Sequence, residues 1–84
     1  MPRAYIAANW KMNGTIAKSD KLVSELIKRL SKNRPNCDVV LCPPFTLIND
    51  VGHKIREVKG LTLGAQDCSE FSMGAYTGDI APEM

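Results

Sequence analysis

The sequence has few of the residues that build disulfide-rich or metal-binding proteins. It has three cysteines, Cys37, Cys42 and Cys68, no Cys-x-x-Cys pair and one histidine in 84 residues. This argues against a disulfide framework and against a zinc site, so we expect no bound metal. An odd number of unpaired cysteines is typical of reduced, buried thiols, which favours a cytoplasmic location.

Long apolar runs and runs of like charge are also missing. The apolar stretch near the N-terminus covers about five residues, which is too short for a signal peptide or a membrane span. Eleven Lys and Arg balance nine Asp and Glu, for a net charge of +2, and no run reaches five like charges. The balance argues against a nucleic-acid or polyanion binder, so we expect neither nucleic acid nor a membrane as partner.

Two further absences concern catalysis. The sequence contains neither G-x-G-x-x-G nor G-x-x-x-x-G-K-[ST], which weakens one interpretation, a truncated doubly wound nucleotide-binding domain. The only histidine, His53, lies off the apolar stripe of a predicted helix. We expect it to face solvent, so no Ser-His-Asp or Cys-His arrangement can be proposed.

What the sequence does contain is a regular alternation of short apolar runs and amphipathic segments. The order β-α-β-α-β with short connections predicts right-handed parallel crossovers and strands buried on both faces. The expected strands are 4–9, 38–42 and 61–66, and the expected helices are 15–30 and 47–57, the second with Thr46 as its N-cap.

The chain length conflicts with this pattern. A chain of 84 residues allows one small domain with a marginal core. The segment Asp67–Asp79 is long for a β-α connection, where roughly 2–6 residues are usual. Pro82 and Glu83 then suit the first turn of a third helix, and the sequence stops one residue later. We therefore expect residues 1–84 to be a single partial domain.

The residues that could carry chemistry follow the three predicted strands, at 9–11, at 42–45 and from residue 66 onward. In parallel α/β folds, ligands bind at the C-terminal ends of the strands. Asn9 and Lys11 lie two residues apart at the first of these ends, and they point the same way if the extended conformation continues. A lysine and an amide at this place suit a phosphate or a developing oxyanion. The alternative is a solvated lysine that follows a buried strand.

The long segment has apolar residues of its own. Phe71, Met73 and Tyr76 are poorly suited to solvent, which favours a partner surface. An alternative function is therefore a non-catalytic small α/β interaction module that uses residues 67–79. The two open sheet edges of such a module argue against it.

Four motifs together closely resemble triosephosphate isomerases. They cover the whole chain in order and with the family's spacing. The motifs are ANWKMNG at 8–14, CPPF at 42–45, LGAQDC at 63–68 and GAYTGDIAPEM at 74–84.

The resemblance implies the N-terminal β-α-β-α-β portion of a (β/α)8 TIM barrel that interconverts dihydroxyacetone phosphate and glyceraldehyde 3-phosphate. The family transfers a proton through an enediolate in glycolysis and gluconeogenesis, and it needs no cofactor. Lys11 matches its catalytic lysine, and Asn9 its substrate-binding asparagine. The family's histidine and glutamate follow later strands, so this chain is expected to be inactive alone.

The resemblance also implies a homodimer in which the long segment inserts into the partner. Thr77 matches the threonine that supports the neighbour's asparagine, and Met12 matches a position covered by the partner. Asp79 stands where the family often has a glutamate that pairs with an arginine of the partner. Phe45 and Tyr76 fall on the same interface.

Overall fold

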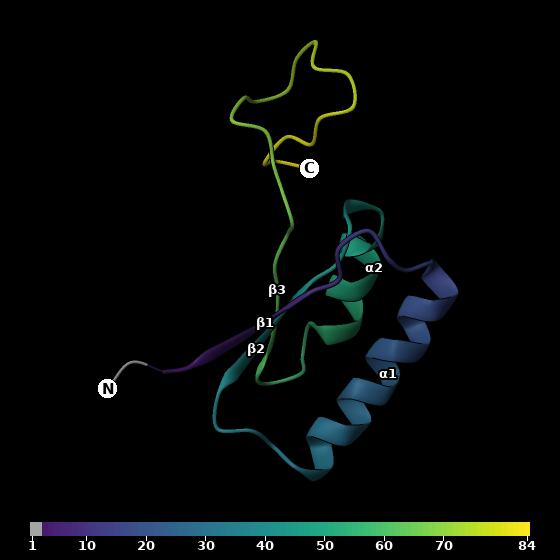
Figure 1. Cartoon of the computed structure of the whole chain (residues 1–84), viewed down its shortest axis with the longest axis vertical. Coiled ribbons are helices and arrows are strands. Elements are labelled where there is room, and N and C mark those ends of the chain that lie inside the picture. Colours follow the sequence, from purple (N-terminus) through teal and green to yellow (C-terminus); the bar gives the residue numbers. More distant parts are fainter. Residues whose placement is uncertain (1–2) are drawn as a thin grey trace.

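The computed structural model describes residues 3–84 and contains a three-stranded sheet with two helices (Figure 1). Its elements follow the expected β-α-β-α-β order. They are β1 (Tyr5–Asn9), α1 (Ile16–Lys32), β2 (Asp38–Cys42), α2 (Phe45–Ile55) and β3 (Leu61–Leu63).

The sheet is parallel, with the strands in the order β1-β2-β3. Both helices cover the same face of the sheet (Figure 1). A doubly wound fold has helices on both faces and a reversal of strand order, and neither occurs in residues 3–84. The structure therefore disfavours the nucleotide-binding interpretation.

The core lies between the helices and this covered face. It consists of Val23, Leu41, Leu47, Val51, Ile55 and Leu61, each no more than 5% exposed. The prediction of strands buried on both faces is wrong for residues 3–84. Tyr5 and Ile6 on β1 are 67% and 57% exposed, because neither helix packs on the second face and β1 is an edge strand.

The helix ends differ in how well they were predicted. The Thr15 hydroxyl accepts a hydrogen bond from the Lys18 amide at 3.2 Å, so α1 begins at a side-chain N-cap. The expected cap of α2 at Thr46 is wrong. That helix begins at Phe45, and Pro44 occupies the N-cap position without a side-chain hydrogen bond. Pro44 has φ −58° and ψ 156°, an extended conformation typical of an N-cap residue, and its carbonyl accepts a hydrogen bond from the Leu47 amide at 2.9 Å.

The chain after β3 is the largest departure from expectation. β3 ends at Leu63, not at residue 66, and residues 64–84 contain no further strand or helix. The third helix expected at Pro82 is a single turn, closed by the Met84 amide on the Ala81 carbonyl at 3.0 Å. Residues 67–84 form a lobe that projects from the sheet (Figure 1). The Ser69 amide closes it on the Ile80 carbonyl at 2.8 Å.

The three cysteines are free. Cys37 and Cys42 are half-buried, but Cys68 is exposed, so the prediction of buried thiols is wrong for Cys68. Among residues 3–84, no helix combines the length and the apolar character that a membrane crossing requires.

A carboxyl pair between α1 and α2 gives a prediction about pH. Asp20 Oδ1 and Asp50 Oδ2 are both enclosed, and Lys54 Nζ lies 3.5 Å from Asp20 Oδ1 in an ion pair. A hydrogen bond to Asp20, then burial and the charge of Asp20, raise the pKa of Asp50 above its ordinary 3.8, although Lys54 and His53 oppose this. A carboxyl group whose pKa is higher in the folded state than in the unfolded state adds to the free energy of unfolding. This contribution is complete below the ordinary pKa and is lost as the pH rises through the raised pKa.

Asp50→Asn is therefore expected to stabilise the full-length protein at pH 7 and to reduce the fall in stability from pH 4 upward. An amide can donate to Asp20 at every pH, as the protonated acid does only at low pH. Urea unfolding midpoints between pH 4 and 8 measure this, with the exposed Glu57→Gln as control. An unchanged pH slope in Asp50→Asn would contradict the assignment.

Candidate functional site

The candidate site lies where β1 and β2 end, in the segment 10–14 that we call the mouth. Lys11 has φ +56°, and no other non-glycine residue among residues 3–84 has a positive φ. The extended conformation therefore stops before Lys11, and the argument that Asn9 and Lys11 point the same way fails. A positive φ is uncommon outside glycine and often marks a functional position.

Hydrogen bonds hold the backbone of Lys11 on both sides. Its amide donates to Asn9 Oδ1 at 2.8 Å, and its carbonyl accepts from Gln66 Nε2 at 3.0 Å. The Asn13 side chain also donates to the Trp10 carbonyl at 2.9 Å. These bonds fix the point from which the Lys11 side chain projects. Since Asn9 Oδ1 is engaged, the Nδ2 donor is the group that Asn9 can still offer to a ligand.

Gln66 marks one of the three strand ends at which the sequence allows a ligand, but its contact with Lys11 was not predicted. Its Nε2 also donates to the Cys42 carbonyl at 2.9 Å, so one amide connects the ends of β1 and β2. The Cys42 carbonyl accepts from the Trp10 amide at 3.1 Å as well. The available signal was an uncharged polar residue at the end of the predicted strand 61–66, on the side of the sheet where ligands bind.

A lysine and an amide donor beside it can bind an anion. The Lys11 side chain is exposed, and an ammonium group is a compact positive charge on a flexible stem. Such a group suits a phosphate or an oxygen that becomes negative during a reaction. It supplies charge stabilisation, while proton abstraction from carbon needs a separate base. His53 is exposed near the end of α2, away from the mouth, as expected.

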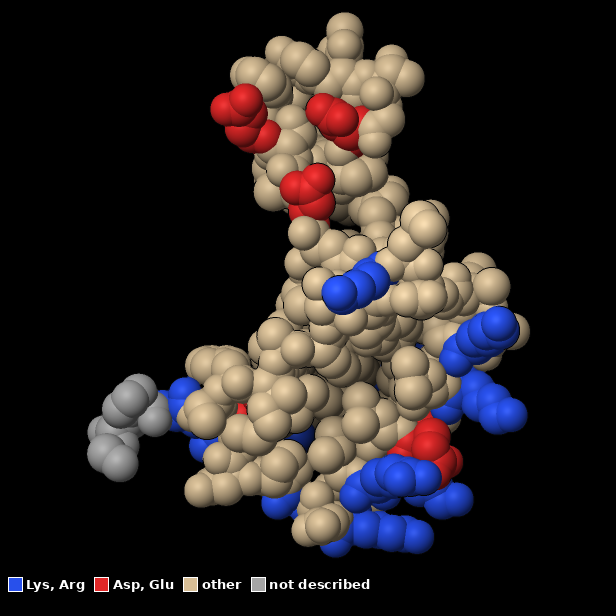
Figure 2. Space-filling model, in the orientation of Figure 1, with Lys and Arg blue, Asp and Glu red and all other residues tan. Residues whose placement is uncertain are grey.

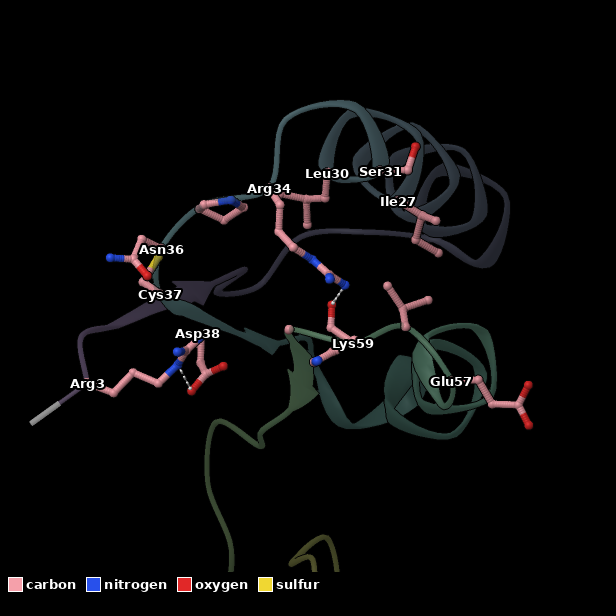
Figure 3. Close-up of a pocket in the computed structure, with 13 residues that line it drawn as sticks. Arg3, Ile27, Leu30, Ser31, Arg34, Asn36, Cys37, Asp38, Glu57 and Lys59 are labelled. Carbon is pink, nitrogen blue, oxygen red and sulfur yellow. Dashed lines mark hydrogen bonds and ion pairs between the residues drawn. The ribbon is translucent and has the colours of Figure 1, made fainter.

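A cavity of about 910 Å³ lies at the other end of the sheet (Figure 3). Arg34 reaches across it and donates to the Lys59 carbonyl at 3.1 Å, and Arg3 pairs with Asp38 at 2.8 Å. Arg3 therefore connects the chain before β1 to the first residue of β2, and Arg34 connects the segments that precede β2 and β3. In parallel barrels this end serves stability and the C-terminal end serves catalysis, so we place the site at Lys11 and not at this cavity.

The residues expected at a dimer interface are all exposed, in two groups. Met12 and Phe45 follow β1 and β2, with 96% and 41% exposure. Tyr76, Thr77 and Asp79 belong to the lobe. The Tyr76 ring stacks on that of Phe71 at 4.6 Å between centroids, so it also supports the lobe from within.

Comparisons with known proteins agree with this geometry. A family model described as triosephosphate isomerase matches residues 4–84. Triosephosphate isomerases of Magnetococcus marinus and Clostridium novyi are 42% and 46% identical over 84 residues, which is all of this chain and 32% of each relative. The chain thus spans about a third of the length of these curated relatives.

A solved structure leads to the same conclusion. The crystal structure of triosephosphate isomerase from Bartonella henselae aligns with a TM-score of 0.74 and 33% identity, over 94% of this chain and 31% of that one. The expected fold, a β-α-β-α-β portion of a TIM barrel, is confirmed. The chain belongs to the triosephosphate isomerase family.

Proposed function

We propose that the full-length protein carrying these residues interconverts dihydroxyacetone phosphate and glyceraldehyde 3-phosphate, as a homodimer in the cytoplasm. The observation that carries the proposal is the anchored, exposed Lys11 at the C-terminal end of β1, in a chain of this family. Glycolysis and gluconeogenesis are the pathways that this activity serves in the family. We expect neither a cofactor, nor a nucleic acid, nor a membrane as partner.

In the proposed reaction these residues stabilise charge. The ammonium group of Lys11 would lie near the substrate phosphate and the oxygen that becomes negative in the enediolate. Asn9 Nδ2 would donate to the substrate beside it. The resemblance assigns the proton transfers to a glutamate and a neutral histidine that follow later strands. Residues 1–84 thus supply an electrostatic part of the site and no base.

The isolated 84-residue polypeptide is therefore expected to show no isomerase activity. A coupled assay that follows glyceraldehyde 3-phosphate formation measures this, with the full-length protein as the active control. Turnover by the 84-residue chain near that of the full-length protein would contradict the proposal that residues 1–84 supply charge stabilisation but no base. A full-length protein with no turnover, together with a cooperative unfolding transition of the short chain, would favour the interaction module.

Gln66→Ala in the full-length protein is expected to lower kcat/KM by about 10- to 100-fold, because small displacements of a catalytic group have effects of this size. The substitution removes the donor to the Lys11 carbonyl, so Gln66 is a positioning residue. The matched control is Ser31→Ala, which loses one side-chain bond to the Lys28 carbonyl at the far end of α1. Equal losses in both variants would contradict a specific role.

A further inference from the structure

The cavity at the N-terminal end of the sheet has no role in the proposed isomerisation, which uses residues at the opposite end. It lies between the end of α1 and the segments that precede β2 and β3, and its volume is about 910 Å³ (Figure 3). Sites for small molecules typically measure about 300–1,000 Å³. The cavity is therefore large enough for a small organic ligand.

The surface at this end of the molecule is basic. Figure 2 shows Lys and Arg over the lower part of the body, away from the lobe, while Asp and Glu are visible mainly on the lobe. A basic surface attracts anions from solution and raises their local concentration. A ligand of this cavity is therefore expected to carry negative charge.

Positive charge inside the cavity is only partly neutralised. Three cations line it, Arg3, Arg34 and Lys59, together with two carboxylates, Asp38 and Glu57. Arg3 is paired with Asp38 at 2.8 Å. The Glu57 carboxylate points away from Arg34 in Figure 3. Among residues 3–84, neither Arg34 nor Lys59 forms an ion pair with a carboxylate. These two cations are therefore available to an anion from solution.

Arg34 is held in place across the cavity. Its Nη2 group donates to the Lys59 carbonyl at 3.1 Å. A guanidinium group has five N–H donors in a planar fork, and this bond uses one of them. The remaining donors can bind two oxygens of a phosphate, and an ammonium group adds a compact second charge. Arg34 and Lys59 thus offer complementary contacts to a doubly charged anion.

Carbonyl groups at the ends of α1 and α2 would repel an anion if they were free, because helix C-termini carry negative partial charge. Near the end of α1, the Arg29 carbonyl accepts from the Asn33 amide at 3.1 Å. At the end of α2, the Ile55 carbonyl accepts from the Val58 amide at 2.9 Å. Donors of the chain itself therefore offset part of this negative charge.

Apolar side chains line the same cavity. Ile27 and Leu30 come from α1, and Val58 comes from the segment before β3. All three are half-buried, so each still has apolar surface that a ligand can cover, and covering such surface favours binding. A ligand with one doubly charged group and an apolar body matches both parts of the lining.

We propose that this cavity binds an organic phosphate monoester at a site separate from the catalytic one. The phosphate binds the Arg34 fork and the Lys59 ammonium group, and the apolar part packs on Ile27, Leu30 and Val58. A bound ester adds a link between the segments before β2 and β3, so it stabilises the folded protein. The site contains no residue of the mouth and does not depend on the proposed isomerase activity.

The experiment maps lysine acylation in the full-length protein, with phenyl phosphate as the probe. A bound phosphate engages the Lys59 amine, Lys32 is an exposed lysine outside the cavity, and Lys11 reports on the mouth. Acetic anhydride labelling is read by peptide mass spectrometry at up to about 20 mM phenyl phosphate, because a ligand of this size binds with Kd on the order of 1 mM. At about ten times Kd, Lys59 is expected to react about 10-fold more slowly and Lys32 at an unchanged rate.

Substitutions of arginine test the site. Arg34→Gln is expected to weaken the protection of Lys59 about 10- to 100-fold, which is the usual effect of losing hydrogen bonds to a charged group. Arg34→Lys keeps the charge without the fork and is expected to fall between. The matched control is Arg56→Gln, which removes an exposed guanidinium just after α2 and outside the cavity. It is expected to leave the protection unchanged. Thermal unfolding checks that each variant is folded.

Several results would overturn the proposal. If phenyl phosphate does not slow acylation of Lys59, the cavity does not bind it, and protection of Lys11 alone then places the anion only at the mouth. Equal slowing at Lys32, or equal weakening by Arg34→Gln and Arg56→Gln, would show a general effect of charge. Inorganic phosphate is expected to protect Lys59 about 10-fold more weakly, because it leaves the apolar side chains uncovered. Equal protection would overturn the organic ester as the ligand.

Discussion

Lys11→Ala in the full-length protein is expected to lower kcat/KM for triose phosphates by about 10²- to 10³-fold, which is the usual cost of removing one group that stabilises transition-state charge. The structure anchors the Lys11 backbone from both sides and exposes its side chain. If the ammonium group binds both the substrate phosphate and the developing oxyanion, its removal changes both KM and kcat. KM is expected to rise and kcat to fall.

The stability of this variant separates a catalytic loss from an unfolded protein. Lys11 has φ +56°, and alanine carries the same Cβ atom into that conformation, so the backbone strain is unchanged. The bonds from Asn9 and Gln66 involve only backbone atoms of residue 11. Lys11→Ala is therefore expected to unfold within about 0.5 kcal/mol of the parent, as surface substitutions usually do.

Lys18→Ala provides the matched control. It removes an exposed lysine from the same end of the sheet, and its amide bond to Thr15 does not depend on the side chain. Steady-state kinetics in both reaction directions and thermal unfolding compare the variants. Unchanged kinetics in Lys11→Ala, or equal losses in both, would refute the catalytic assignment.

The order and type of the elements could be predicted because they depend on local patterns. The apolar stripe of α1 and the end of β2 at Cys42, before Pro43, are each specified within a few residues of sequence. Glu25 and Arg29, four residues apart on α1, likewise form an ion pair at 3.1 Å. The prediction failed at the N-cap of α2, where Thr46 was expected and Pro44 occupies the position.

The site was predictable in its residue types and not in its geometry. The end of a strand beside an asparagine and a lysine indicated where anion chemistry could occur. The local bond from the Lys11 amide to Asn9 does not by itself indicate a positive φ, and the second bond on the Lys11 backbone comes from a residue distant in the chain. The contact from Gln66 to the Lys11 carbonyl spans 55 residues. Exposure of β1 also depends on which faces the helices cover, which is a property of the whole sheet.

Gly14 connects the mouth to the core, and Gly14→Ala is expected to destabilise the full-length protein by about 2–5 kcal/mol. Gly14 has φ +115°, which any L side chain adopts at a cost of roughly 1–2 kcal/mol. A Cβ at this position would lie 2.9 Å from Leu47 Cδ1. Leu47 is 2% exposed and belongs to the core, so it has little room to move. Overpacking of this kind costs about 1–3 kcal/mol more.

Gly60→Ala separates the two costs, because Gly60 has a comparable φ of +92° but nothing within 4 Å of the position of a Cβ. It is expected to lose only the backbone cost of about 1–2 kcal/mol. Urea unfolding of both variants measures the difference. In Leu47→Ala the clash disappears, so adding Gly14→Ala to it is expected to cost no more than Gly60→Ala does alone. Equal effects of Gly14→Ala with and without Leu47 would show that contact with the core is not the cause.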